Sequence, residues 1–139
     1  MITRRTLLAS SAALLALPLA AQAEMAKLFY TPGLAEKDMA DGRVILLDFW
    51  ASWCSTCRAQ VRVMDELRAE NPAYDAAIRF ITVDWDEHGE GELSKSLNIP
   101  RRSTLVLLKG KTELGRTVAG TSREEIKALL DAGLAAAGA

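Results

Sequence analysis

Cys54 and Cys57 are the only cysteines of the 139-residue chain, and two residues separate them. They follow a nearly continuous apolar run, residues 44–51, and open a segment whose apolar residues recur at helical spacing. A cysteine in the first helical turn meets outward-pointing N–H groups and the positive end of the helix dipole, which stabilise a thiolate. Because the thiolate is the nucleophile of disulfide exchange, we expect Cys54 to attack and Cys57, one turn along, to resolve the mixed disulfide.

Three other uses of the cysteine pair fit the sequence less well. A structural disulfide that closes a four-residue ring removes little chain entropy. A zinc site needs four ligands, and besides the cysteines the chain offers one histidine, His88. Haem attachment requires a histidine directly after the second cysteine, where this chain has Arg58. The pattern therefore predicts a redox-active pair and no metal site.

Strand and helix patterns alternate around the cysteines. The chain begins with a short apolar segment, followed by a loop with a short helix, a buried strand and a helix that ends at an Asn-Pro pair. A strand rich in β-branched residues and another short helix come after this pair. Ser52 is a candidate cap for the helix that begins at Cys54. These elements are expected, in order, at residues 28–30, 31–41, 44–51, 54–70, 79–85 and 91–97.

The C-terminal part reads as a hairpin followed by a helix. Strands are expected at 104–108 and 113–118 around a Lys-Gly-Lys turn, and Ser122 with Glu125 forms a capping box for a helix that runs to about Ala136. Strands that alternate with helices predict an α/β fold, with a central sheet and helices on both faces.

The first residues have the three regions of a secretory signal peptide. Arg4 and Arg5 precede an apolar run, residues 7–19, and the small-x-small triplet Ala-Gln-Ala ends at Ala23. We expect cleavage after Ala23, a soluble domain over 24–139 and a periplasmic location, where disulfides persist. A membrane anchor would need about 20 apolar residues, and this run is shorter and interrupted by Pro18. The arginine pair also resembles a twin-arginine signal, so both export routes stay open.

Composition limits the possible partners. Half of the residues are hydrophobic and a quarter are charged, which is typical of a globular domain. The chain has 17 basic and 18 acidic residues, and the leader holds two of the basic ones, so its removal leaves a mildly acidic protein. This balance argues against a nucleic-acid partner. No second apolar span follows the leader, and we expect a monomer.

Residues 48–57 read Asp-Phe-Trp-Ala-Ser-Trp-Cys-Ser-Thr-Cys, and this segment resembles the active-site segment of thioredoxins. The resemblance continues through residues 104–120 and the final helix. It implies a thioredoxin-like fold with a mixed sheet, and a protein-disulfide oxidoreductase that uses no cofactor. It also implies that Asp48 accepts the proton of the resolving thiol and that Trp53 shields the cysteines. A carboxyl group in an apolar strand should have a raised pKa, which suits proton transfer near neutrality; the alternative is an acid that reaches solvent at the end of the sheet.

The chain departs from this family opposite the cysteines. Thioredoxins have a cis-proline there, and the better alignment places Ser103 at that position, whereas a rival register places Pro100. A cis bond before serine costs about 2.5–4 kcal/mol, so we expect a trans Arg102–Ser103 bond. The resemblance implies that this loop, including Arg102, Ser103 and Thr104, contacts the substrate.

Charge and composition differ from the family at other positions too. Arg101 and Arg102 favour an acidic partner surface. The residues between the cysteines are Ser-Thr rather than Gly-Pro, and they tune the redox potential within the family. Thr82 stands where the family often has a lysine near the buried acid, which should leave Asp48 less compensated and raise its pKa further.

Residues 84–89 (Asp-Trp-Asp-Glu-His-Gly) resemble the start of a calcium-binding loop. His88 and Lys95 stand where calcium ligands would be required, so we expect a solvated acidic loop.

The function expected from these observations is the reduction of disulfides in exported partner proteins. By analogy with periplasmic reductases of this family, a membrane thiol-reductant conductor would supply the electrons. Two alternatives stay open. One is a dithiol oxidase of exported proteins, and the other is a Cu(I)-handling protein of the same fold that uses Cys54 and Cys57 as soft ligands.

Overall fold

A four-stranded mixed sheet forms the centre of the protein. The computed structural model describes residues 24–138, so the expected signal peptide, residues 1–23, lies outside the described residues. The strand order is β2-β1-β3-β4, in which β1 pairs with β2 in parallel and with β3 antiparallel, and β3 and β4 form an antiparallel hairpin. The strands are β1 (Val44–Trp50), β2 (Arg79–Asp84), β3 (Thr104–Lys109) and β4 (Thr112–Val118). The expected mixed sheet is confirmed.

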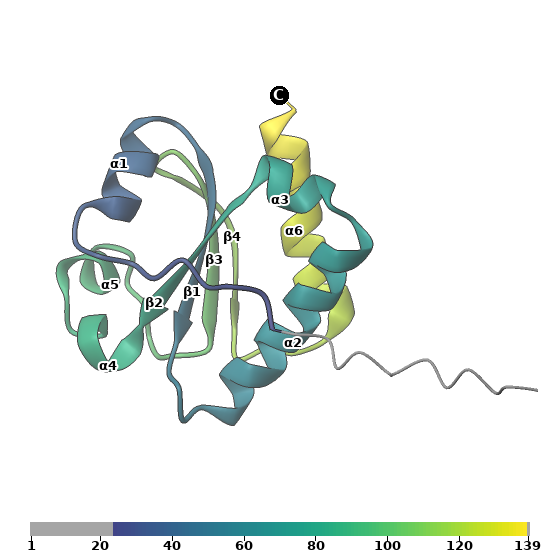
Figure 1. Ribbon diagram of the computed structural model, residues 1–139. Helices are drawn as coiled ribbons and strands as arrows, with labels where there is room; N and C mark the ends of the chain where they lie inside the picture. The colour runs from purple at the N-terminus through teal and green to yellow at the C-terminus, as the bar shows by residue number, and fades with distance from the viewer. Residues whose placement is uncertain (1–23, 139) are drawn as a thin grey trace, which may run out of the picture.

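Helices cover both faces of this sheet (Figure 1). On one side lie α1, α4 and α5, and on the other lie α2, α3 and α6. The bounds are α1 (Leu34–Ala40), α2 (Ser55–Glu70), α3 (Ala73–Ala77), α4 (Trp85–His88), α5 (Glu92–Ser96) and α6 (Arg123–Ala137). Among the described residues, no helix has the length and apolar character needed to cross a bilayer.

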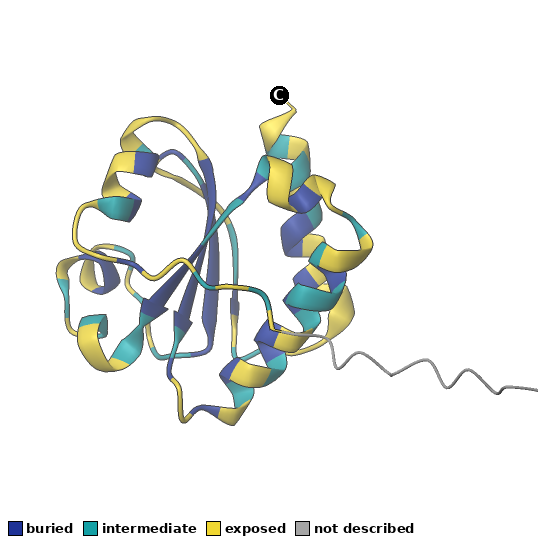
Figure 2. Cartoon of the chain, viewed as in Figure 1, coloured by how far each residue is buried: buried dark blue, intermediate teal, exposed yellow. Residues whose placement is uncertain are grey.

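Side chains of β1 alternate between two hydrophobic clusters, one on each face. Ile45, Leu47 and Phe49 pack in the cluster that includes α1 and α5, whereas Val44 and Leu46 pack in the cluster that includes α2 and α6. A strand covered on both faces must be apolar throughout, which explains the continuous run in the sequence. Figure 2 shows the central strands β1 and β3 buried and the outward faces of the helices exposed, and the edge strand β4 is mostly exposed or intermediate. The alternation also places residue 48 on the face that α2 covers.

Two short helices were not expected. Asn71 and Pro72 end α2 as predicted, but Pro72 is also the N-cap of α3, because proline fits the start of a helix where no N–H donor is needed. In the segment expected to be a solvated acidic loop, the Asp84 carboxylate accepts a hydrogen bond from Asp86 N–H at 3.0 Å and caps α4. The loop prediction was therefore wrong for residues 85–88.

The expected first strand is reduced to a single bridge between Phe29 and Thr82, on the outer edge of β2. Thr82 N–H donates to Leu28 O and Tyr30 N–H donates to Thr82 O, both at 2.8 Å. These bonds hold the N-terminal segment against the edge of the sheet. At the other end of the domain, Ser122 Oγ accepts a hydrogen bond from Glu125 N–H at 3.2 Å, which starts α6 at the expected place.

Candidate active site

Cys54 is itself the N-cap of α2. Its backbone is extended, and its Sγ accepts a hydrogen bond from Cys57 N–H at 3.1 Å. The expected cap, Ser52, is exposed instead, and its carbonyl oxygen accepts a hydrogen bond from the Arg58 guanidinium at 3.3 Å. The Cys54 sulfur thus takes the place that a serine or aspartate oxygen usually occupies at a helix start, where the helix dipole favours negative charge.

The two cysteines form a disulfide, with their Cα atoms 5.2 Å apart. Cys54 is 3% exposed and Cys57 is fully buried. They pack with buried Ala51 and with the partly buried rings of Trp50 and Trp85. The cysteine pair therefore lies in an apolar environment between the end of β1 and the start of α2, as the order of strand, cysteine motif and helix in the sequence predicts.

Ser103 lies directly against the disulfide. Its Oγ is 3.1 Å from Cys54 Sγ and 3.2 Å from Cys57 Sγ. This contact confirms the alignment that places Ser103 opposite the cysteines, since Pro100 is exposed. No peptide bond among residues 24–138 is cis, so the expected trans Arg102–Ser103 bond is confirmed.

The backbone of Ser103 is held on both sides. Its N–H donates to Phe49 O at 2.7 Å, and its carbonyl oxygen accepts from Ala119 N–H at 2.8 Å and from Gln60 Nε2 at 2.9 Å. Gln60 also donates to Gly120 O at 2.9 Å, so one buried amide joins the loop before β3 to the loop after β4. Sequence reasoning missed Gln60, although a glutamine on the buried face of an amphipathic helix is a signal that it has a buried polar partner.

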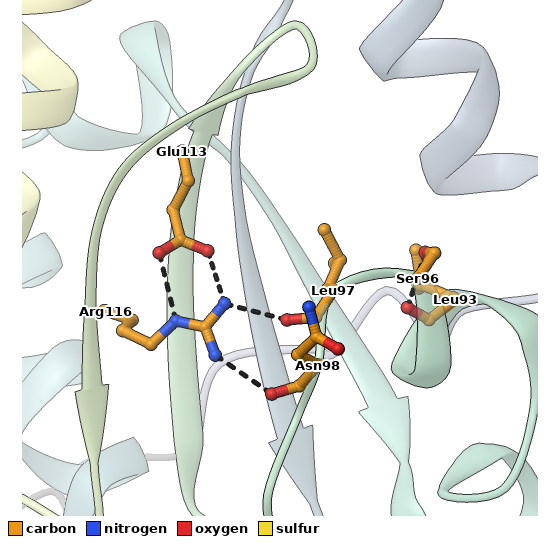
Figure 3. Close-up of polar contacts among 6 residues, drawn as sticks. All are labelled: Leu93, Ser96, Leu97, Asn98, Glu113 and Arg116. Atoms are coloured by element: carbon orange, nitrogen blue, oxygen red, sulfur yellow. Dashed lines mark hydrogen bonds and ion pairs between the residues drawn. The ribbon is translucent and has the colours of Figure 1, made fainter.

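The start of the Ser103 loop is fixed by Arg116 of β4 (Figure 3). Its guanidinium donates to Leu97 O at 2.8 Å and to Asn98 O at 3.3 Å, and it also pairs with the carboxylate of Glu113. A bidentate carboxylate contact restricts the arginine to one orientation. The chain that leads from α5 to Ser103 is therefore tied to the hairpin.

Asp48 is buried on the face of β1 that α2 covers, and it is 4% exposed. Its Oδ1 has no hydrogen-bond partner among the described residues. Burial raises the pKa of Asp48 to about 7, the ammonium of Lys27 lowers it, and the carboxylate of Asp65 raises it. The carboxyl group does not stand in open solvent at the sheet end, and both of its protonation states are accessible near neutral pH.

Asp48 and Lys27 line a cleft of about 830 Å³ between the N-terminal segment, β1, β2 and α2. The segment is fastened to α2 by the Met25 N–H, which donates to Asp65 Oδ2 at 3.1 Å. Lys27 pairs with Glu24, and its Nζ lies 5.5 Å from the centre of the Trp50 ring.

Thr82 pairs with Asp48 in the β1–β2 register, as expected from the position of the family lysine. The pKa of Asp48 is raised, as expected for an acid with less compensation, and the positive charge that partly offsets the burial comes from Lys27 in another segment. Sequence reasoning missed Lys27, since nothing local marks a residue from the N-terminal segment as a neighbour of β1.

Trp53 is 55% exposed and is held from two sides. Its indole N–H donates to the two carboxylate oxygens of Asp86 at 3.0 and 3.2 Å, and the Arg102 guanidinium carbon lies 4.5 Å from the ring centre. Sequence reasoning missed Asp86, which belongs to the segment expected to be merely solvated. Thr104 is buried, and its hydroxyl donates to Arg101 O at 2.8 Å, so this side chain shapes the loop.

The chain is similar to known proteins of one family. The family model described as Thioredoxin matches residues 33–132 of the chain. A thioredoxin of Listeria monocytogenes is 30% identical over 96 residues, which cover 68% of this chain and 85% of that protein. The chain belongs to the thioredoxin family. Thioredoxin 1 of Nostoc is 27% identical over 102 residues, which cover 73% of this chain and 91% of that protein.

Solved structures show the same fold. The structure of Trxlp from Edwardsiella tarda has a TM-score of 0.65 and 24% identity, and the match covers 76% of this chain and 98% of that one. Oxidised thioredoxin from Plasmodium falciparum has a TM-score of 0.62 and 20% identity, with 76% and 96% covered. With its paired Cys54 and Cys57, this member of the family is a protein-disulfide oxidoreductase of the thioredoxin-like α/β fold.

Proposed function

We propose that this thioredoxin-family protein is exported to the periplasm, loses residues 1–23, and reduces disulfides of exported partner proteins. The observation that carries the proposal is the Cys54–Cys57 disulfide at the start of α2, with a buried acid, Asp48, on the sheet face beneath that helix. The basic head, apolar run and Ala-Gln-Ala triplet of the first 23 residues support export.

In the first step, the Cys54 thiolate attacks one sulfur of the partner disulfide. A Cys54–partner S–S bond forms as the partner disulfide breaks, and the other partner sulfur leaves with the electron pair and takes a proton from water. Because Cys54 Sγ accepts the Cys57 N–H and caps α2, the thiolate is stabilised before the partner arrives.

In the second step, the Asp48 carboxylate takes the proton of the Cys57 thiol, and the Cys57 thiolate attacks Cys54 Sγ. The Cys54–Cys57 bond forms, the bond to the partner breaks, and the second partner sulfur leaves as a thiolate that takes up a proton. Two electrons and two protons have then passed to the partner. A pKa of about 7 suits Asp48 to this role, because the group both accepts and releases a proton near neutrality.

Recharging runs these steps in reverse with a protein dithiol as the donor. Its thiolate attacks the Cys54–Cys57 disulfide and is itself oxidised to a disulfide. For a protein in the periplasm, a membrane protein that conducts thiol reductant across the membrane would supply these electrons. Arg101 and Arg102 beside the cysteines fit an acidic partner surface.

The reduction potential of the Cys54–Cys57 pair, measured in glutathione and dithiothreitol buffers, tests the direction. A reducing potential supports the reductase, and a strongly oxidising one supports a dithiol oxidase instead. If no disulfide forms between Cys54 and Cys57 at any buffer redox potential, the redox proposal fails, and Cu(I) titration becomes the next measurement. The Cys57→Ser variant should accumulate mixed disulfides with partners on Cys54, whereas Cys54→Ser should accumulate none.

Export is tested separately by mass spectrometry of the protein from cell fractions. The proposal expects a periplasmic protein whose first residue is Glu24. Replacement of Arg4 and Arg5 by lysine should block export if the twin-arginine route is used and should leave export by the general route intact. A cytoplasmic protein with residues 1–23 retained would contradict the proposed location and leave the redox chemistry untouched.

A further inference from the structure

The Ser103 hydroxyl has only the two sulfurs as partners among the described residues. Its Oγ lies 3.1 Å from Cys54 Sγ and 3.2 Å from Cys57 Sγ, in a residue that is fully buried. The sulfurs of a disulfide carry no hydrogen, so the hydroxyl is the only possible donor, and its one hydrogen can point to either sulfur or be shared between them. A buried donor aimed at the reacting atoms stabilises whichever sulfur becomes negative.

The backbone of Ser103 is in the left-handed region, with φ 62°, where residues other than glycine are rare. Such a conformation persists only where the surrounding structure holds it, and it is concentrated at functional sites. Here both backbone polar groups of Ser103 are used, by Phe49 O on one side and by Ala119 N–H and Gln60 Nε2 on the other. Asn98 and Ala119 share the positive φ, but neither is buried against the sulfurs.

These observations assign a role to the hydroxyl itself. We propose that Ser103 is a catalytic residue whose hydroxyl donates a hydrogen bond to the thiolate of the Cys54–Cys57 pair, and so stabilises the reduced protein and the sulfur that leaves when the disulfide opens. This role rests on the dithiol function proposed above.

The hydroxyl serves both directions of exchange. In the reduced protein the Cys54 thiolate receives two donors, the Cys57 N–H at the helix start and the Ser103 O–H. When a donor thiolate attacks Cys54 Sγ, the donor–Cys54 bond forms and the Cys54–Cys57 bond breaks. Cys57 Sγ then leaves with the electron pair, within reach of the same hydroxyl, which keeps its proton throughout.

The first measurement is the pH dependence of Cys54 alkylation by iodoacetamide in the reduced full chain, with the modified cysteine identified by mass spectrometry. Only a thiolate reacts, so the midpoint of the profile reports how well the thiolate is stabilised. Hydrogen bonds to charged groups are strong enough that Ser103→Ala should raise this midpoint by about one pH unit, a ten-fold loss of thiolate at pH values below both midpoints. The same variant should shift the reduction potential toward more reducing values.

Two further variants separate the hydroxyl from the backbone. Ser103→Gly accepts φ 62° without strain, lacks the hydroxyl, and keeps the test available if the alanine variant folds poorly. Ser103→Thr retains a hydroxyl, although a β-branched residue is strained at φ 62°, and wherever it folds it should stay near the parent midpoint. Ser94→Ala is the matched control, because Ser94 is also buried but donates to His88 O, away from the cysteines.

The proposal expects both Ser103→Ala and Ser103→Gly to raise the midpoint and Ser94→Ala to leave it unchanged. An unchanged midpoint in Ser103→Gly would overturn it, whatever the alanine variant does, since backbone strain would then explain any alanine effect. Because alkylation needs no partner protein, a raised midpoint would support the role of Ser103 even if no exported partner were ever reduced. Failure of the proposed reductase and failure of this inference are therefore distinguishable.

Discussion

Lys27 and Asp48 line the same cleft, although one belongs to the N-terminal segment and the other to the central strand β1. The lysine charge lowers the pKa of Asp48, against the burial that raises it to about 7. Thr82, which pairs with Asp48 in the β1–β2 register, carries no charge. Lys27 supplies the positive charge that partly offsets the burial of this carboxyl group. The segment 25–30 therefore influences the protonation of Asp48, the acid that we propose serves the cysteine pair.

Removal of this charge should raise the pKa of Asp48 above about 7. In Lys27→Met the cleft keeps its packing but loses its positive charge, so the neutral carboxyl group is favoured. The pKa is measured by NMR titration of the carboxyl carbon in the oxidised protein. Lys37→Met is the control, because Lys37 is exposed and pairs with Asp41 on α1. Equal pKa values of Asp48 in both variants would contradict the assignment of Lys27.

Asp48 should make the oxidised protein less stable as the pH rises. The folded-state pKa is raised to about 7, so between about pH 4 and pH 7 the folded protein keeps a proton that the unfolded chain releases. The contribution of Asp48 to stability is therefore fully present below about pH 4 and is lost as the pH rises through 7, by roughly 4 kcal/mol for a shift of about three pKa units.

The isosteric Asp48→Asn variant should remove this dependence. We expect it to match the parent near pH 4 and to exceed the parent's free energy of unfolding at pH 8, as measured by guanidinium chloride unfolding. Asp41→Asn is the control, because Lys37 holds the pKa of that exposed carboxyl below its usual value, and its charge does not change between pH 5 and 9. If parent and Asp48→Asn lost stability in parallel, the ionisation of Asp48 would not be the cause.

The indole of Trp53 should become mobile without Asp86. That carboxylate accepts the indole N–H, while Arg102 covers the ring, so Asp86→Ala leaves only one of the two contacts. We expect several-fold faster hydrogen exchange at Trp53 Nε1, measured by NMR, since the exchanging proton loses its acceptor. Glu87→Ala, which removes the neighbouring carboxylate that pairs with His88, should leave this exchange rate unchanged. An unchanged rate in Asp86→Ala would mean that this hydrogen bond does not protect the indole.

A side chain at Gly133 on α6 should crowd the hydrophobic core. A Cβ there would lie 2.6 Å from Ile78 Cδ1 and 3.0 Å from Leu107 Cδ1, and both of these side chains are buried. Overpacking costs about 1–3 kcal/mol, which exceeds the gain of about 1 kcal/mol that alanine brings to a helix. Gly133→Ala should therefore lower the free energy of unfolding by about 1 kcal/mol.

The matched variant is Gly138→Ala at the end of the same helix. Its nearest atoms would lie 3.8 Å or more from the new Cβ, and its φ of −83° suits any residue. Thermal or denaturant unfolding should show a change within about 0.5 kcal/mol. If the two substitutions changed the free energy of unfolding equally, the close contact with Ile78 would not be what destabilises Gly133→Ala.

Patterns that depend on neighbours along the chain were readable from the sequence. The continuous apolar run of β1 predicts a strand covered on both faces, and it correctly implies the burial of Asp48. The position of Cys54 at the start of α2 follows from the strand that ends just before it. The short helices α3 and α4 escaped prediction because a single turn has too few residues to show a period.

Contacts between distant segments were decided by the tertiary structure alone. Lys27, Gln60 and Asp86 are ordinary polar residues in the sequence, and each acquires its role from a partner in another element. The sequence, through its resemblance to thioredoxins, favoured Ser103 as the residue opposite the cysteine pair and left Pro100 as the rival. Only the fold decided that its hydroxyl reaches both sulfurs, because that reach depends on a positive φ held by Phe49, Ala119 and Gln60, and no local propensity encodes long-range hydrogen bonds.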